Sequence, residues 1–116
     1  MIDDSVAACA RKCVLCWLAT SDAQGQPNVS PKEVFAPYDS QRLVIANIAS
    51  PLTARNIEAN PKVCVSFVDI FVQKGFKLAG VARNLAPSAA EFAALAAPLE
   101  TMTQGLFPIR SVFVVE

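Results

Sequence analysis

The chain has 116 residues, of which 53% are apolar and 17% charged, and its ten basic and ten acidic side chains give a formal net charge of zero. This balance argues against the broad basic surface that a nucleic-acid partner requires, and the absence of histidine removes the commonest general base and metal ligand. We therefore expect a single domain, residues 1–116, with no metal centre and no hydrolase triad.

The first forty residues predict a short helix followed by a β-hairpin. Asp3 or Asp4 is positioned to cap the helix, which is expected to end near residue 12. The apolar run 14–21 predicts the first strand of the hairpin, and residues 28–36 predict the second. Glycine and proline between the two runs supply the turn.

The next segment predicts a buried strand that leads into the start of a helix. Residues 43–45 are a compact apolar run, and Ser50-Pro51 is a helix-start signal; the helix is expected to end at Asn60, because a proline follows it. Such a start carries unpaired N–H groups and the positive end of the helix dipole, which together favour an anion such as phosphate. A capped helix with solvated side chains is the simpler interpretation. The polar residues near this end are Thr53, Arg55 and Asn56.

Two further strands are expected after this helix. Residues 62–68 form an apolar run without polar alternation, which predicts a strand covered on both faces. Residues 76–84 predict the next strand, and Lys74-Gly75 is interpreted as a turn or bulge just before it.

The C-terminal third predicts a helix and a last strand. Ser88 and Glu91 have the spacing of a capping box that opens the helix, while Pro98 is expected to kink or divide it. Gly105 is expected to end the helix, and residues 109–115 predict the strand. Four apolar residues recur at helical spacing, namely Phe92, Leu95, Leu99 and Met102.

The order of these elements defines the expected fold class. Six strands with short turns, and helices that do not alternate regularly with them, argue against a doubly wound parallel sheet. They favour a mainly β fold, a small six-stranded antiparallel barrel with peripheral helices. No glycine-rich nucleotide loop is present.

The four cysteines are interpreted as structural thiols. Cys13 and Cys16 have a CxxC spacing, but if both are extended their side chains point to opposite faces of a sheet. Cys9 and Cys13 share a helix face, with no other ligand type nearby in the sequence. Redox or zinc chemistry remains the alternative to a small apolar role.

Three blocks of the sequence, in this order, resemble the pyridoxamine 5'-phosphate oxidase-like family of FMN-binding split barrels, especially its short single-domain members. They are LATSDAQGQPNVSPKEVF (18–35), LVIANIASPLTARNIEANPKVCVSF (43–67) and KGFKLAGVA (74–82). The resemblance implies a six-stranded antiparallel split barrel that pairs as a homodimer, with FMN bound at two sites along the interface. Such an interface would account for the high apolar content.

The resemblance also implies where the cofactor lies. The phosphate is expected at the turn that enters the helix at Pro51, and the flavin ring against the strand around Ser30 and the segment after Ile45. Lys32 and Lys74 are alternatives for a second cation. The implied cofactor-binding residues are Ser30, Pro31, Lys32, Ala46, Asn47, Ile48, Ser50, Thr53, Arg55, Asn56 and Lys74.

Two positions have open interpretations. Lys32 near the flavin pyrimidine edge would stabilise the anionic reduced ring, whereas the alternative is a solvated strand lysine. Glu33 stands where relatives often have a small residue, so it is expected to crowd the ring or to meet a substrate. The C-terminal segment, histidine and arginine of true pyridoxamine phosphate oxidases are missing, so oxidation of vitamin B6 is not expected.

The implied function is that of an FMN-dependent oxidoreductase that passes hydride through flavin N5, with a reduced nicotinamide as one possible donor. The alternatives are a flavin-binding or electron-carrier protein without a substrate, and a barrel that binds F420 or heme instead. No run of about 18 apolar residues and no basic leader is visible, so neither a membrane span nor secretion is expected, and we expect a cytoplasmic location.

Overall fold

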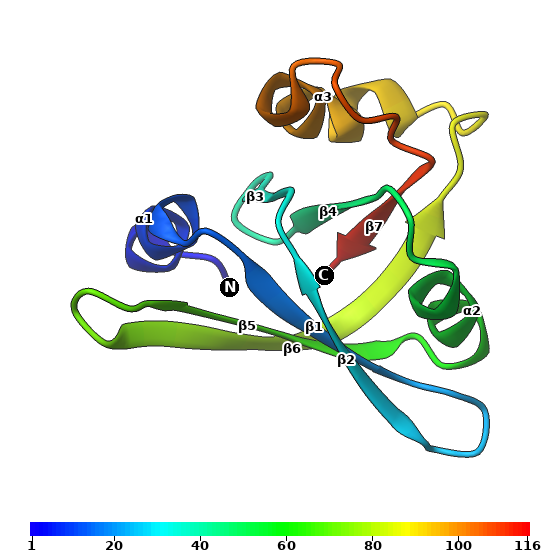
Figure 1. Ribbon diagram of the computed structural model, residues 1–116, viewed down its shortest axis with the longest axis horizontal. Helices are drawn as coiled ribbons and strands as arrows, with labels where there is room; N and C mark the ends of the chain where they lie inside the picture. The colour runs from blue at the N-terminus through cyan, green and yellow to red at the C-terminus, as the bar shows by residue number, and fades with distance from the viewer.

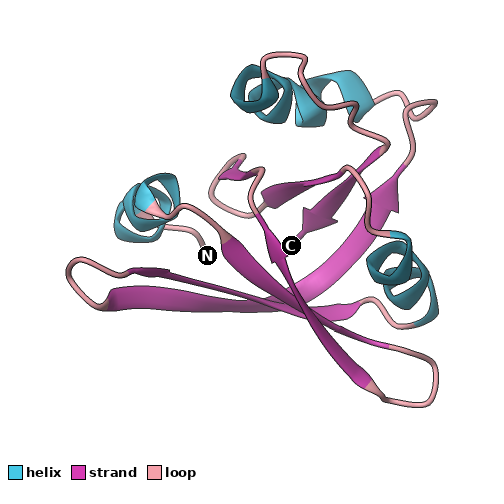
Figure 2. Cartoon of the chain, in the orientation of Figure 1, coloured by secondary structure: helices cyan, strands magenta, loops and turns pink.

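The computed structural model describes all 116 residues and consists of one curled sheet with three helices around it (Figures 1 and 2). The elements follow in the order α1 (Asp4–Lys12), β1 (Cys16–Ser21), β2 (Pro27–Lys32), β3 (Phe35–Pro37), β4 (Leu43–Asn47), α2 (Pro51–Ala59), β5 (Lys62–Asp69), β6 (Lys74–Leu85), α3 (Phe92–Thr103) and β7 (Ser111–Val115). No helix is both long and apolar enough to cross a membrane.

The sheet confirms the mainly β, antiparallel fold class. Its strand order is β2-β1-β5-β6-β7-β4-β3, and all neighbouring strands are antiparallel. The two edge strands, β2 and β3, are consecutive in the chain and only Glu33 and Val34 separate them. The same stretch of chain therefore runs along one edge of the sheet and then along the other, so the sheet curls into a half-barrel (Figure 1).

This crossing explains why there are seven strands instead of the predicted six. Residues 28–36 look like one strand, but Pro27–Lys32 pairs with β1 and Phe35–Pro37 pairs with β4. The partner changes at Glu33, where the chain leaves one edge of the sheet. Val34 then accepts a backbone hydrogen bond from Ala46 at 2.9 Å, which ties the crossing to β4.

Both local predictions at the first helix and the first hairpin are confirmed. The Asp3 side chain accepts a hydrogen bond from the backbone N–H of Val6, as expected of an N-cap. Gly25, in the β1–β2 turn, has a φ of +85°, a conformation that glycine adopts without steric cost. Strand β1 starts at Cys16, two residues later than predicted, because Val14 lies in an exposed bend.

The prediction of a turn or bulge at Lys74-Gly75 is wrong. Both residues pair within the β5–β6 hairpin, Lys74 opposite Asp69 and Gly75 opposite Val68. The turn is residues 70–73 instead, with Gln73 at a φ of +56°. Gly75 is needed for close packing, since a Cβ there would lie 2.2 Å from the carbonyl oxygen of Phe67.

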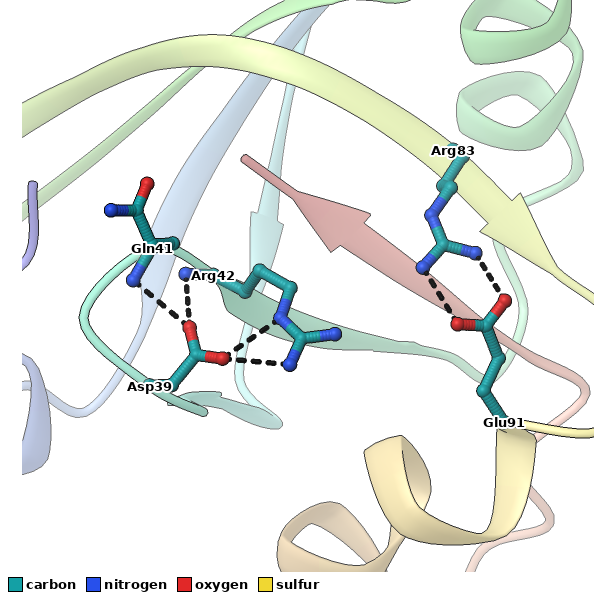
Figure 3. A network of polar contacts seen from close by, with 5 residues as sticks. All are labelled: Asp39, Gln41, Arg42, Arg83 and Glu91. Atoms are coloured by element: carbon teal, nitrogen blue, oxygen red, sulfur yellow. Dashed lines mark hydrogen bonds and ion pairs between the residues drawn. The ribbon is translucent and has the colours of Figure 1, made fainter.

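The prediction of a capping box at Ser88 and Glu91 is also wrong, because Glu91 binds a residue that is distant from the helix start. Its carboxylate accepts two hydrogen bonds from the Arg83 guanidinium, at 2.8 and 3.1 Å (Figure 3). Helix α3 begins at Phe92 without a side-chain cap and continues through Pro98, which does not divide it. The only other ion pair, Asp39 with Arg42, is somewhat less exposed and lies in the β3–β4 turn (Figure 3).

The core has two parts, one on each side of strands β4 and β7. The first fills the barrel with side chains such as Leu18, Ile45 and Phe113, and the second packs beneath α3 around Leu95 and Leu99. All five residues of β4 and all five of β7 are buried for this reason. The apolar run at residues 43–45 lacks alternation because both faces of the strand are covered.

Candidate cofactor-binding site

Helix α2 starts where β4 ends, and one asparagine holds the connection. The Asn47 Oδ1 atom accepts a hydrogen bond from the Ser50 backbone N–H at 3.0 Å, and Asn47 Nδ2 donates to Ser111 Oγ at 2.9 Å. Asn47 is buried, so its amide is committed to the fold. It positions the residues of the helix start, and Pro51 then fits the first turn because its missing N–H would have been unpaired there.

The N-terminus of α2 is left without an anionic or side-chain cap. Ser50 is the N-cap residue, but its hydroxyl makes no capping hydrogen bond, and no acidic residue lies in the first turn. The positive end of the helix dipole is therefore not offset by any side chain of α2 itself. An external anion would be stabilised at this position.

Lys32 brings a buried cation to the same helix start. The residue is only 6% exposed, and its Nζ donates hydrogen bonds to Ser50 Oγ at 2.5 Å and to Thr53 Oγ1 at 3.2 Å. The ammonium also lies 5.8 Å from the ring centroid of Phe113. Ser30 extends the cluster, with its Oγ 3.4 Å from Thr53 Oγ1.

The charge of this lysine has no counter-ion in the chain. The two ion pairs of the structure lie elsewhere, and the partners of Lys32 are neutral hydroxyls and an aromatic ring. Burial lowers the pKa of Lys32. Burial likewise raises the pKa of the Cys16 thiol to about 12, so it stays protonated near neutral pH and supplies no charge. An unpaired buried cation is costly, which favours a bound anion beside it.

A cavity of about 280 Å³ opens beside this cluster, between the β2–β3 crossing and the end of β4. Five of the predicted cofactor-binding residues line it, together with Glu33, which was expected to crowd the ring or to meet a substrate. Three further lining residues were not predicted, of which Phe107 comes from the loop after α3 and has no sequence signal that links it to the site. The lining residues are Pro31, Lys32, Glu33, Val34, Ala46, Ile48, Ala49, Ser50 and Phe107.

The remaining predicted residues lie at different places. Asn56 points inward, where its Nδ2 donates to the buried Thr20 Oγ1 at 3.0 Å. Arg55 is exposed on α2 and makes no ion pair. Lys74 lies at the far end of the β5–β6 hairpin, away from α2, where its carbonyl accepts a hydrogen bond from Cys9 (Figure 1).

These residues fit the chemical demands of a flavin nucleotide. The uncapped helix start, the Lys32 ammonium and the hydroxyls of Ser50 and Thr53 suit an anionic group. The adjoining cavity has small and apolar walls at Ala46 and Ile48, which suit a flat ring. The Lys32 ammonium has no counter-ion in the chain, and an anionic ligand would stabilise it.

The curled antiparallel half-barrel places the chain in the class of small split-barrel proteins, and the cavity at the start of α2 contains one basic residue, Lys32, and one acidic residue, Glu33. The family model described as pyridoxamine 5'-phosphate oxidase matches residues 2–113, and the chain belongs to this family. None of the curated proteins matches the sequence.

Solved structures share the fold over nearly the whole chain. HupZ of Group A Streptococcus is 26% identical with a TM-score of 0.82, covering 100% of this chain and 89% of HupZ. The heme storage protein HutZ of Vibrio cholerae is 25% identical with a TM-score of 0.70, covering 91% of this chain and 82% of HutZ. An FMN-binding protein of Syntrophomonas wolfei is 16% identical with a TM-score of 0.68, covering 97% of this chain and 82% of that protein.

Proposed function

We propose that the protein binds FMN and acts as an oxidoreductase in which hydride passes through the flavin. The observation that carries the proposal is Lys32, a buried ammonium at the open end of α2 whose only partners are hydroxyls and an aromatic ring. A cation in that setting is stabilised by an anionic ligand. Family membership and the fold shared with an FMN-binding protein support a flavin as that ligand.

The chain's own residues divide into two binding roles. Ser50, Thr53 and the exposed Arg55 would hold the phosphate at the start of α2, where the helix dipole adds about 0.3–1 kcal/mol. The ring would lie in the cavity along Pro31, Ala46 and Ile48, and these side chains would exclude water from one face of the ring. Lys32 stands beside the cavity, so its charge would stabilise the reduced anionic ring. FMN, when bound, supplies the hydride chemistry at N5.

A second copy of the chain is the proposed partner. Large apolar side chains line one groove between the β5–β6 hairpin and the segment that leads from α1 into β1, which we name the hairpin groove; it includes Val14, Trp17, Val68, Ile70 and Phe71. Phe71 is 90% exposed in the single chain. An exposed patch of this kind is typical of an association surface, and a homodimer would cover it.

The test of the proposed function is reconstitution with FMN. The purified protein is expected to bind FMN with a shift in the flavin absorbance bands, and NADH or NADPH is then expected to reduce it with turnover. A protein that takes up neither FMN nor F420 would overturn the flavin proposal. Flavin binding without turnover by any reduced donor would identify a carrier instead.

Heme is the second candidate, favoured by the 25% identity to HutZ over most of the chain. Lys32 and the helix start suit a propionate as well as a phosphate. The chain contains no histidine, however, so this protomer supplies no imidazole ligand for iron. Addition of hemin in the same reconstitution separates the two, because a Soret band that shifts only in the presence of the protein would favour heme.

The affinity for FMN is expected to fall as the pH rises toward 10.5. Burial holds the pKa of Lys32 below 10.5 in the free protein, and a bound anion raises it again. Between those two pKa values binding takes up a proton, so affinity decreases with pH; below the pKa of the free protein Lys32 contributes no dependence. Fluorescence titrations at stepped pH measure this slope. Lys32→Met is expected to lack it, and an unchanged slope in that variant would assign it to another group.

A further inference from the structure

We propose that Cys9 and Cys13 form a binding site for a soft, thiophilic monovalent cation, represented by Cu(I). The two residues lie four positions apart at the C-terminal end of α1, and their sulfur atoms are 4.0 Å apart. Both side chains are half-buried free thiols. The cofactor-binding site uses neither of them.

The separation of the two sulfur atoms matches a bridging ion. With metal–sulfur bonds of about 2.3 Å, sulfur atoms 4.0 Å apart subtend an angle of about 120° at the ion. This is the angle of a three-coordinate, trigonal site. A further oxygen beside Cys9 is the carbonyl of Lys74, which accepts a hydrogen bond from Cys9 Sγ at 3.7 Å. Binding of the ion releases one proton from each thiol.

The ligand set argues for Cu(I) over zinc. A structural zinc site needs four ligands, almost always Cys or His. The chain has no histidine, and no third Cys, Asp or Glu completes a cluster around this pair. Soft thiolates select Cu(I), which is stable with only two or three ligands.

A disulfide fits the same pair poorly. It needs sulfur atoms about 2.05 Å apart and Cβ atoms about 3.8 Å apart, whereas Cβ atoms four positions apart on a helix lie about 5–6 Å apart. The backbone N–H of Cys13 still donates to the Cys9 carbonyl at 3.2 Å, which keeps the helical spacing. An ion bridges the gap without breaking the last turn of α1.

Cys9 is reachable from solvent outside the hairpin groove, whereas Cys13 is one of the residues that line that groove. Cys9 lines a separate surface cavity of about 300 Å³, together with Asp69 and Lys74 at the end of the β5–β6 hairpin. Asp69 is the one acidic residue of this cavity, whose lining also includes two lysines, Lys12 and Lys74.

The experiment titrates the full chain with Cu(I) under anaerobic conditions against a chromophoric Cu(I) chelator. One Cu(I) is expected to bind per chain. Cys9→Ser and Cys13→Ser are each expected to lower the affinity at least about a hundredfold, because outer-shell partners alone are worth ten- to a hundredfold. Circular dichroism reports whether each variant is folded.

Cys64→Ser is the matched control, since Cys64 is also a half-buried free thiol but lies on β5. It is expected to bind Cu(I) like the unaltered chain. Undiminished binding in a folded Cys9→Ser or Cys13→Ser variant would overturn the proposal. Loss of two hydrogens from this pair on treatment with oxidised glutathione, without any Cu(I) uptake, would also overturn it in favour of a disulfide. None of these outcomes depends on whether the protein binds FMN.

Discussion

Lys32→Met is expected to weaken FMN binding by about ten- to a hundredfold, because a charge-assisted hydrogen bond is worth about 1.5–3 kcal/mol. The same substitution is expected to stabilise the ligand-free fold by about 1 kcal/mol or more. Methionine preserves most of the side-chain volume and removes a buried ammonium that has no counter-ion. The two effects have opposite signs because the cation is costly without a ligand and useful with one.

Urea denaturation of the ligand-free protein and fluorescence titration with FMN measure the two effects separately. Lys62→Met is the matched control, since Lys62 is an exposed lysine on β5, and it is expected to change neither quantity by much. A Lys32→Met protein that is less stable and binds FMN as before would show that the ammonium serves the fold instead of a ligand. The proposed function would then lose its main support.

The elements that sequence predicted well depend on neighbouring residues. Asp3 caps α1 through the N–H of Val6, three residues on, and Pro51 starts α2 through its own backbone geometry. The interactions that decide these structures are only a few residues apart, so the local pattern contains them. The strand at residues 43–45 was predictable for a similar reason, since a run buried on both faces has no polar alternation. The same reasoning was wrong for residues 62–68, because only one face of β5 is covered and Ser66 and Val68 are exposed.

The errors occur where a distant partner decides the structure. Nothing within residues 28–36 shows that Lys32 pairs with β1 while Phe35 pairs with β4. Glu91 matches a capping box, yet its carboxylate binds Arg83 on strand β6. The sequence analysis predicted Lys32 as a cofactor-binding residue. It did not predict that the charge of Lys32 would be buried, because burial depends on the packing of β2 against α2. Phe107 reaches the cavity from a loop for which no local signal exists.

The hairpin groove offers the second test with a large expected effect. Phe71→Glu is expected to convert a dimer into a monomer, since aromatic anchors at the centre of an interface are worth about 2 kcal/mol or more. A glutamate at each copy of this site would also place like charges across the two-fold axis. Sedimentation velocity over a range of concentrations measures the change as a weakening of the dimer by about thirtyfold or more.

Measuring FMN affinity in the same variant tests whether the hairpin groove and the cofactor-binding site depend on each other. If the second copy closes the site, the Phe71→Glu variant is expected to lose FMN affinity in parallel with dimer dissociation, because one face of the ring is left in water. Met102→Glu is the control, as Met102 is a half-exposed apolar residue on α3, away from the hairpin. A monomeric Phe71→Glu protein with full FMN affinity would mean that one protomer holds the ring unaided. A variant that remains dimeric would place the interface on a different face of the barrel.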